Sequence, residues 1–502
     1  MLSLLIGIPL LGSILIGLIP EQAGKGLHRA LALGFGWVLF GLSAGLLLIF
    51  DPHLGSLQLA ERMAWIPQLG LVYEVGVDGI SLPLVVMTGL LVLMAIWASG
   101  QVERPRLYYS LVLMLAAAVA GAFLARNLLL FFLFYEVELI PLYLLIAIWG
   151  GPRRTYAATK FLVYTALSGI LLLIGFFGLS WLSDAHSFTY TVLQAHPLPL
   201  VQQTLLLIPI LLGLAIKIPL VPFHTWLPDA HVEASTPISV LLAGLLLKLG
   251  TYGLVRFGLQ LLPDAWDQAG PWLAGWAVVN VLYGSLNALV QQDMKKLVAY
   301  SSIAHMGYIL LAVAAATPLS LVGSIFQMVS HGLISSLLFL LVGAVYANTG
   351  TRDLKLLRGL LNPERGLPLI GSLMVLGVMA SGGTPGMVGF IAEFTLFRGS
   401  FAVFPLQTLL CMVGTGLTAA YFLLMVNRVF FGRLSQVAIA MQRHATEERL
   451  PAVVLATLVV LLGLQPSWAT RWVESTTLAL AKANLAGVAG LVTAFQFGLS
   501  SF

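Results

Sequence analysis

The chain has 502 residues, of which 59% are hydrophobic and 9% are charged, and its mean hydropathy is +0.98. Soluble domains carry roughly 25% charged residues, so this composition excludes a chain that covers itself with polar surface, and a bilayer must be its solvent. The net charge of +5 is spread over short loops, which excludes a nucleic-acid-binding face, and the single cysteine, Cys411, excludes a disulfide framework and a four-thiolate iron–sulfur cluster.

Long apolar runs recur along the whole chain. The first run lacks a charged leader region and a small-residue cleavage site, so we expect a retained span and not a signal peptide. Because a span needs about 20 apolar residues, we predict an all-α polytopic membrane protein with about fourteen transmembrane helices. They lie near 1–19, 29–49, 78–99, 107–124, 127–149, 158–181, 203–222, 237–259, 272–290, 297–316, 319–347, 367–398, 404–431 and 450–465. The tail 470–502 is expected to hold either a surface helix or a further span, and the longest polar connection is 51–77.

The basic residues predict the orientation of these helices. Of the 25 Lys and Arg residues, 17 fall in loops after odd-numbered helices, among them Lys25 and Arg443, and six fall on the other side. Because cytoplasmic loops are enriched in Lys and Arg, both termini should face the non-cytoplasmic side. We expect Arg126, Arg256 and Arg398 to reach the interface by extending along their helix ends.

A few ionisable residues fall near the centres of predicted helices. Each costs roughly 2.5–3.5 kcal/mol there on insertion scales, and such residues usually mark an ion path or a buried pair. They are Glu136, Glu138, Lys217, Lys248, His305, His331 and Glu393.

Glu136 and Glu138 lie in the run FFLFYEVELIPLYLLI. Two residues apart on a helix, their side chains point about 200° apart, so they cannot both face one partner. Pro141 follows and frees a backbone carbonyl nearby. We expect Glu136 to be functional, and Glu138 to face either the protein interior or a second helix or subunit.

Lys217 lies in the run KIPLVPFHTWLPDAH, between Pro209, Pro219 and Pro222. These prolines predict a broken helix, and non-helical backbone at membrane depth survives only where protein or a water-filled cavity surrounds it. A buried lysine can lose its proton by desolvation and regain it when a carboxylate approaches, so Lys217 is a candidate proton carrier. The alternative is a static Lys–Glu pair that locks two helices together.

Lys248, His305 and His331 each belong to a stripe of small and polar residues at helical spacing. Such stripes face protein and not lipid. Two histidines on neighbouring predicted helices favour a relay, although a lone buried histidine is usually only a satisfied hydrogen-bonding residue. The stripes are Gly244, Lys248 and Tyr252; Ser301, Ser302, His305 and Tyr308; and Ser324, Gln327, His331 and Ser335.

Glu393 follows a second predicted break, at Gly382–Gly383–Thr384–Pro385–Gly386. The two breaks fall on the seventh and twelfth predicted helices. An odd offset of five helices gives the two units opposite topology, as inverted repeats require. Within a single membrane domain, 1–502, we therefore predict N-terminal helices in 1–106, a first repeat (helices 4–8) in 107–259, a second (helices 9–13) in 272–431, and a C-terminal helix and tail in 432–502.

Five stretches of this sequence together resemble the antiporter-like, proton-pumping membrane subunits of respiratory complex I and its photosynthetic relative. The likeness covers about 70–435 and is strongest to the chain 4 (NdhD) type of NAD(P)H-quinone oxidoreductase. NPERGLP and NRVFFGRL further resemble the cyanobacterial carbon-dioxide-uptake variant. The five stretches are KIPLVPFHTWLPDAHVEASTPISVLLAGLLLK, FYEVELIPLYLLIAIWGG, MKKLVAYSSIAHMGY, MVSHGLISSLLFLLVGAVY and TPGMVGFIAEF.

The resemblance implies fourteen core helices, two inverted five-helix repeats and a polar axis in the membrane plane. It assigns roles to six residues. Glu136 pairs with Lys217, and Lys248 is the central relay lysine. His305 and His331 match bridging histidines of the second half, and Glu393 is the terminal residue of the path. Asp229, His231 and Glu233 match a loop motif that is left outside the path as a structural clasp.

The resemblance also implies what surrounds the chain. No cofactor is expected on this chain, and the quinone, iron–sulfur clusters and electron donor are expected on other subunits. The expected partners are lipids, other membrane-arm subunits that include further antiporter-like ones, and a carbon-dioxide-hydrating subunit in the uptake variant. The expected location is the cyanobacterial thylakoid membrane, with lumenal termini. The implied function is proton translocation coupled to electron transfer elsewhere in an NAD(P)H- or ferredoxin-quinone oxidoreductase.

Two other classes share these features. A subunit of a multi-subunit sodium/proton antiporter would contain the same motifs, and its transport would depend on sodium. A structural membrane subunit would use the buried charges only to hold helices in register, and neutralising Lys217 would leave pumping unchanged.

Overall fold

Long apolar helices account for most of the chain. The computed structural model describes residues 1–22, 24, 26–441 and 449–487; Lys25, Arg443 and the end of the predicted tail, 488–502, lie outside the described residues. Among the described residues, ten helices or continuous helical segments are long and apolar enough to cross a membrane, and α1 (Leu2–Leu18), α16 (Pro368–Ser381) and α20 (Arg449–Leu464) are shorter apolar helices.

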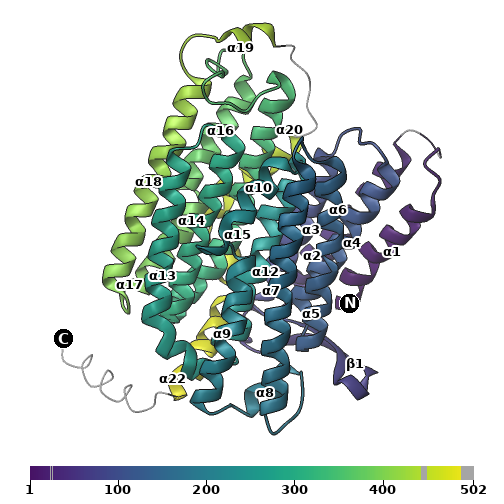
Figure 1. Ribbon diagram of the computed structural model, residues 1–502, viewed down its shortest axis with the longest axis vertical. Helices are drawn as coiled ribbons and strands as arrows, with labels where there is room; N and C mark the ends of the chain where they lie inside the picture. The colour runs from purple at the N-terminus through teal and green to yellow at the C-terminus, as the bar shows by residue number, and fades with distance from the viewer. Residues whose placement is uncertain (23, 25, 442–448, 488–502) are drawn as a thin grey trace.

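The helices run side by side along the long axis of the molecule (Figure 1). Each predicted span coincides with one helix or with consecutive helical segments, which confirms the fold class. The first half contains α2 (Leu27–Ile49), α3 (Ser81–Ala98), α4 (Pro105–Leu124), α5 (Leu128–Val137), α6 (Leu139–Trp149), α7 (Arg154–Leu182), α8 (Tyr190–Ala195), α9 (Leu200–Lys217), α10 (Trp226–Glu233), α11 (Thr236–Leu241) and α12 (Leu247–Gly253). The second half contains α13 (Pro263–Leu289), α14 (Met294–Ala315), α15 (Pro318–Thr349), α17 (Val388–Phe401), α18 (Pro405–Phe430), α19 (Gln436–Ala440), α21 (Ser467–Thr470) and α22 (Glu474–Gly487).

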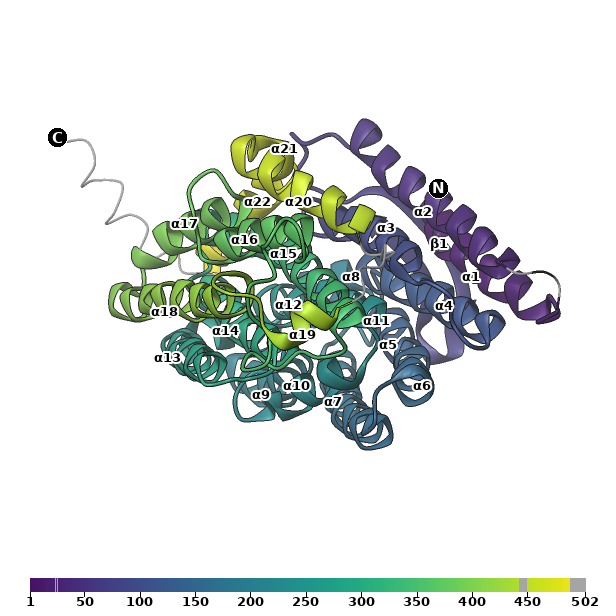
Figure 2. The same cartoon turned by 90° about the horizontal axis from the view of Figure 1, so that it is seen from above.

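The two halves lie next to each other when the bundle is seen from above (Figure 2). In that view α4, α5, α6, α7 and α9 form one side and α13, α14, α17 and α18 form the other. The long helix α15 lies between them, beside α11 and α12, and every residue of its apolar window is buried. Side chains on α12 and α15 are therefore shielded from lipid.

Both predicted breaks are present. In the seventh predicted helix, 203–222, the α-helix α9 ends at Lys217, and the chain continues through the 3-10 helix η2 (Phe223–Thr225) into α10. The twelfth divides into α16 and α17. At the first break, the freed backbone groups are satisfied by side chains of α13: Val221 N donates to Asn280 Oδ1 (2.8 Å), and Trp276 Nε1 donates to Val221 O (2.6 Å). At the second, Gly383 and Gly386 adopt positive φ angles of 71° and 87°, which favour glycine.

Three further departures from regular helix were not predicted. The fifth span is interrupted at Glu138, between α5 and α6. The eighth span, Thr236–Leu259, is continuous but contains two π-helical stretches, η3 (Leu242–Leu246) and η4 (Leu254–Leu259), on either side of α12. π-Helical turns are rare and are frequent at functional sites.

The polar connection 51–77 contains the two strands of the chain's described part, which were not predicted from the sequence. This connection forms an antiparallel hairpin of β1 (Gln58–Ile66) and β2 (Leu71–Val77), with the short 3-10 helix η1 (Pro67–Leu69) between the strands. The run LVYEVGV in β2 has the β-branched residues of a strand, and Gly70, with φ of 67°, ends the turn. The hairpin extends from the lower end of the bundle (Figure 1).

The described part of the tail contains the helix α22, whose residues Thr477 and Ala481 are buried. Thr476 near its start accepts a hydrogen bond from Gly79 N (3.1 Å), and Ser475 Oγ donates to Pro52 O (2.6 Å). α22 is thereby docked against the two segments that flank the hairpin in sequence, before β1 and after β2.

Candidate functional site: a buried row of charged side chains

Lys217 is the last residue of α9, and its side chain is fully buried. It forms an ion pair with Glu138, whose side chain is also fully buried. Lys217 Nζ also lies 4.2 Å from the centroid of the Tyr135 ring, within the range of a cation–π contact. The carbonyl groups at the C-terminus of α9 further favour a positive charge at this position.

The predicted pairing of Lys217 with Glu136 was wrong. Glu136 is half-buried, and a Cβ added at Gly169 of α7 would lie only 1.7 Å from Glu136 Oε1. Among the hydrogen bonds of the described residues, Oε1 has no partner, although the atom is buried. Glu136 therefore lies against α7, and Glu138 is the carboxylate that contacts the lysine.

The helical segment is interrupted at Glu138 itself, although its backbone stays in the right-handed helical region. Pro141 has no N–H with which to bond the carbonyl of Val137, where α5 ends. Glu138 is the residue between the two helices, and its carbonyl accepts from Leu142 N (3.3 Å). A continuous helix was assumed in the sequence argument, whereas the proline three residues after Glu138 was the signal that could have located the break.

Lys248 lies in α12, between the two π-helical stretches. Its Nζ donates a hydrogen bond to Ala243 O (2.6 Å) and lies 2.7 Å from His331 Nδ1 on α15. Both side chains are buried. When Lys248 is charged, Nδ1 of His331 accepts, so its other ring nitrogen, Nε2, carries the hydrogen.

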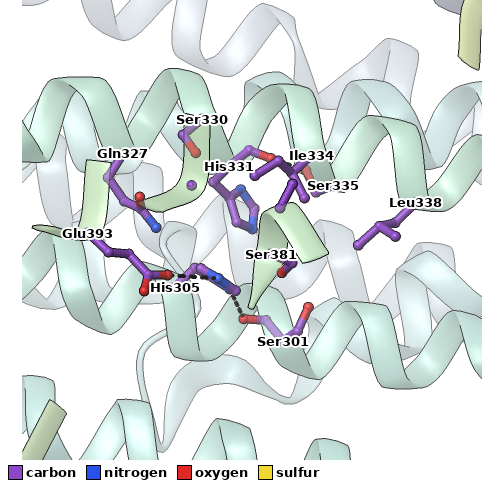
Figure 3. Close-up of a pocket in the computed structure, with 12 residues that line it drawn as sticks. Ser301, His305, Gln327, Ser330, His331, Ile334, Ser335, Leu338, Ser381 and Glu393 are labelled. Carbon is purple, nitrogen blue, oxygen red and sulfur yellow. Dashed lines mark hydrogen bonds and ion pairs between the residues drawn. The ribbon is translucent and has the colours of Figure 1, made fainter. Parts of the chain in front are cut away.

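His331 faces His305, and His305 faces Glu393 (Figure 3). The two imidazole rings have centroids 5.5 Å apart, and His305 Nε2 lies 3.6 Å from Glu393 Oε1. His305 Nδ1 lies 2.8 Å from the carbonyl oxygen of Ser301, which can only accept, so Nδ1 carries a hydrogen. A single proton can then lie either on His305 Nε2 or on the Glu393 carboxyl group.

Glu393 is also held from α18. Its Oε2 accepts a hydrogen bond from Thr415 Oγ1 (2.9 Å), and Thr415 Oγ1 lies 3.4 Å from Tyr308 Oη. Thr415 was not predicted from the sequence. α18 contains several threonines, and no motif or helical spacing distinguishes Thr415 from the others.

A small polar cavity of about 10 Å³, roughly enough for one water molecule, lies along this row. Of its twelve lining residues, Ser301, Gln327, Ser335 and Ser381 are polar neighbours of the two histidines (Figure 3). Three buried polar atoms of lining residues have no hydrogen-bond partner among the described residues: His331 Nε2, Gln327 Oε1 and Ser330 Oγ. Buried polar groups normally find partners, so an ordered water molecule in this cavity would bond to at least one of these atoms.

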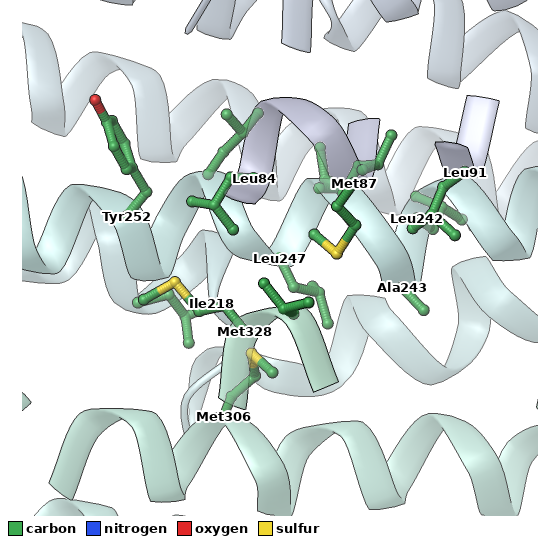
Figure 4. Packing of buried hydrophobic residues seen from close by; sticks show 14 of the residues in the cluster. Leu84, Met87, Leu91, Ile218, Leu242, Ala243, Leu247, Tyr252, Met306 and Met328 are labelled. Atoms are coloured by element: carbon green, nitrogen blue, oxygen red, sulfur yellow. The ribbon is translucent and has the colours of Figure 1, made fainter. Parts of the chain in front are cut away.

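Two clusters result: the pair Glu138–Lys217, and the row from Lys248 to Glu393. No hydrogen bond or ion pair between described residues joins them. Apolar side chains around Leu247, from α3, α12, α14 and α15, pack beside them (Figure 4). The two helices that carry the lysines come close at Gly250, where an added Cβ would lie 2.6 Å from Ile218 Cγ1 and 3.4 Å from Lys217 Cβ.

Arg126 and Arg256 do not extend to the interface as predicted. Both are buried and both bind Asp78, which precedes α3: Arg126 at 2.9 Å and Arg256 through two contacts of 2.6 Å. Burial alone would raise the pKa of the Asp78 carboxyl, but the two guanidinium groups hold it well below its usual range. Arg398, in contrast, is exposed near the end of α17.

The loop motif in α10 makes contacts that tie this helix to the start of α7. Asp229 accepts from Lys160 Nζ (2.8 Å), and Glu233 Oε2 accepts from Arg153 N (2.8 Å). His231 stacks on Phe339, with ring centroids 4.5 Å apart. These contacts agree with a clasp between helices. Across the described residues, no group of three or more His, Cys, Asp or Glu side chains could hold a metal ion.

Comparisons with known proteins agree with this architecture. Residues 125–418 match the family described as NADH:quinone oxidoreductase/Mrp antiporter, TM. The chain is 43% identical over 496 residues to NAD(P)H-quinone oxidoreductase chain 4 1 of Synechococcus sp. (strain JA-3-3Ab), and the alignment covers 96% of this chain and 92% of that protein. It is 40% identical to NAD(P)H-quinone oxidoreductase chain 4 2 of Thermosynechococcus vestitus, with the same two coverages.

Two solved structures share the fold. A chain of respiratory complex I from Thermus thermophilus is 29% identical, with a TM-score of 0.88, and the match covers 96% of this chain and 100% of that chain. A chain of the Mrp complex from Dietzia sp. is 22% identical, with a TM-score of 0.86 over 96% of this chain and 99% of that chain, and it supports the fold alone. With a family match over more than half its length and relatives above 40% identity, the chain belongs to the NADH:quinone oxidoreductase/Mrp antiporter transmembrane family.

Proposed function

We propose that this chain is an antiporter-like membrane subunit of an NAD(P)H-quinone oxidoreductase complex and that it moves protons along the buried row of charged side chains. The observation that carries this proposal is the sequence of close contacts from Lys248 through His331 and His305 to Glu393, inside a bundle whose outer surface faces lipid. Buried ionisable groups in a membrane usually mark such a path. The chain-4 relatives, at 40–43% identity, support the assignment to the complex.

The pair Glu138–Lys217 is the input of the path. While Glu138 holds it, Lys217 keeps its proton, because the carboxylate and the end of α9 both stabilise the cation. Charge displaced by electron transfer in neighbouring subunits would open this pair. Lys217 would then be a buried cation without a partner and would release its proton toward Lys248. Glu136, close by, is a second carboxylate that could receive or pass on that proton.

The row from Lys248 carries the proton onward. Lys248 Nζ can transfer a proton to His331 Nδ1 over 2.7 Å, and the same ring then releases a proton from Nε2. Water in the cavity would connect Nε2 to His305, and His305 Nε2 passes the proton to Glu393. Glu393 is the release group of this subunit. Moving one charge against 100 mV costs about 2.3 kcal/mol, which a change of roughly two pKa units would supply at about 1.4 kcal/mol per unit.

The chain itself carries no proposed redox step. We propose that quinone, iron–sulfur clusters and the electron donor bind other subunits, that further antiporter-like subunits lie beside this one, and that a carbon-dioxide-hydrating subunit is a partner if the complex is the uptake variant. The cyanobacterial relatives support a thylakoid location, and the distribution of Lys and Arg supports lumenal termini.

Two measurements on the complex purified in mild detergent test this function. Co-purification with the hydrophilic subunits of a quinone reductase, and proton uptake by proteoliposomes during quinone reduction in sodium-free buffer, are the expected results. Co-purification with small antiporter subunits, or transport that requires sodium, would instead assign the chain to a sodium/proton antiporter.

A further inference from the structure

Two adjoining features on α18 form a binding site that the proton path does not use. The first is an apolar groove along the outer face of the helix, and the second is a cationic pocket at its C-terminal end. The groove is lined by Ala420, Leu423, Leu424, Val426, Asn427 and Phe431. The pocket is lined by Leu354, Lys355, Leu357, Arg358, Asn427, Arg428, Phe431 and Gly432. Because Asn427 and Phe431 belong to both, the two are continuous.

The charge of the pocket is entirely positive. Lys355, Arg358 and Arg428 line it and are exposed, and none of the lining residues is acidic. Among the hydrogen bonds and ion pairs formed by side chains of the described residues, none engages these three cations. They are available to an anion that approaches from outside the chain.

The pocket is held in shape by the backbone. The loop that carries Lys355 and Arg358 is bonded to the end of α18: Gly359 N donates to Phe431 O (3.2 Å), and Leu361 N donates to Phe430 O (2.9 Å). Gly432 has a φ of 85°, and a Cβ added there would lie 2.9 Å from Arg358 Nε. The guanidinium of Arg358 therefore rests directly on the glycine, facing the same pocket as Arg428.

The position of the site matches the boundary of a bilayer. α18 has 26 residues, so it is about 39 Å long, whereas the hydrocarbon core is about 30 Å thick. The last turns of α18, with Arg428, then reach the headgroup region on the arginine-rich side. Leu423 and Leu424 are 58% and 42% exposed one to two turns earlier, at the depth of acyl chains.

We propose that this site binds an anionic membrane lipid, with its phosphate or sulfonate headgroup among Lys355, Arg358 and Arg428 and an acyl chain in the groove of α18. A free anion would occupy only the pocket and would leave the apolar groove uncovered. A partner helix would need acidic residues at one end and an apolar face to match both features. The lipid satisfies the charge and the groove with a molecule that surrounds the protein in any case, and cationic pockets beside transmembrane helices favour such headgroups.

The test uses the whole complex, reconstituted in nanodiscs that contain phosphatidylcholine with a minor fraction of phosphatidylglycerol. The double variant Arg358→Gln/Arg428→Gln is compared with the charge-matched control Lys296→Gln/Arg365→Gln, whose side chains lie outside the pocket. We expect phosphatidylglycerol retained after detergent extraction, counted by native mass spectrometry, to fall several-fold in the first variant and not in the control. Excess inorganic phosphate should fail to displace the lipid, because it cannot fill the groove.

Equal retention in both variants would overturn the proposal. Displacement by phosphate alone would show an anion site without a lipid. A photoreactive residue in place of Leu424 should cross-link to lipid; capture of a neighbouring polypeptide at that position would show that a subunit covers the groove instead. Gly432→Ala provides an independent check, since it should displace Arg358 and weaken retention while leaving every charge in place.

Discussion

Lys217 is a buried cation whose surroundings stabilise its charge in three ways: a carboxylate, an aromatic ring and the end of a helix. Of the three, Glu138 alone carries a full opposite charge. Removing Glu138 would leave an uncompensated buried charge, which is why the residue that contacts the lysine should matter more than its neighbour.

Glu138→Gln should therefore reduce proton pumping more than Glu136→Gln. The amide keeps the size of the side chain but cannot pair with the ammonium group of Lys217. Proton uptake by proteoliposomes at a matched rate of quinone reduction measures the difference. A larger loss in Glu136→Gln would restore the pairing predicted from the sequence and contradict the contact in the structure.

At the other end of the path, Glu393→Gln should stop transport through this subunit while the complex still assembles. The amide oxygen can still accept from Thr415 Oγ1, so the local hydrogen bond survives. The amide group, however, cannot take up and release a proton as a carboxyl group does. Thr415→Val, which removes the hydrogen bond and keeps the carboxyl group, should lower transport only in part. Full transport in Glu393→Gln would place the exit elsewhere.

The six predicted path residues show which features of the site can be predicted from sequence patterns. Polar stripes at helical spacing predicted that Lys248, His305 and His331 face protein, and all three are buried. Glu393 was found instead through the second helix break. Helical periodicity predicted that Glu136 and Glu138 point to opposite sides, but it could not decide which of the two contacts Lys217. Their roles in proton transfer stay predictions until they are measured.

At the scale of elements, the close approach of α12 to the end of α9 controls the distance between the two lysines. Gly250→Ala adds a Cβ that would lie 2.6 Å from Ile218 Cγ1, so the helices must separate. We expect transport to fall several-fold with all titratable groups still present. Gly275→Ala on α13 is the matched control, because no atom lies within 4 Å of its added Cβ. Equal transport in the two variants would show that this spacing is unimportant.

The ion cluster Asp78–Arg126–Arg256 joins the loop before α3, the start of α5 and the end of η4. Asp78→Asn leaves two buried arginines without their anion and should lower stability by about 3–5 kcal/mol. Thermal unfolding in detergent measures this, with exposed Asp51→Asn as the control. An unchanged midpoint would mean that water replaces the carboxylate.

The same cluster has a defined pH dependence. Since the folded-state pKa of Asp78 is depressed, its contribution to stability is fully present above the ordinary carboxyl value of about 3.9. It is lost only as the pH falls below that value, through the folded-state pKa. Asp78→Asn should therefore remove part of the acid sensitivity of unfolding in that range.

The elements that the sequence predicted poorly share a cause. The hairpin 58–77 is short and carries several charges, so its alternation is weak next to the strong apolar signal of the spans. Arg126 and Arg256 lie at span ends, where extension to the interface is the usual outcome, and only their common contact with Asp78, far away in sequence, shows otherwise. In contrast, the long apolar runs predicted the helices correctly, and the runs of proline and glycine predicted both breaks.

For the whole molecule, the two halves repeat one contact with the charges exchanged. In the first half, Glu138 on the fifth span pairs with Lys217 on the seventh; in the second, His305 on the tenth span lies beside Glu393 on the twelfth. Both pairs link helices two apart, and they are related by an offset of five. This is the arrangement that two inverted five-helix repeats predict, with one ionisable pair beside each broken helix.

The most direct test of the account is the ratio of protons pumped to electrons transferred by the purified complex in proteoliposomes, measured for Lys217→Ala. The variant removes the input cation of the proposed path and leaves the redox subunits unaltered. The account predicts a lower ratio than in the wild-type complex, with Lys296→Ala, a lysine outside the path, unchanged. A wild-type ratio in Lys217→Ala would contradict it and would leave the buried charges with only a structural role.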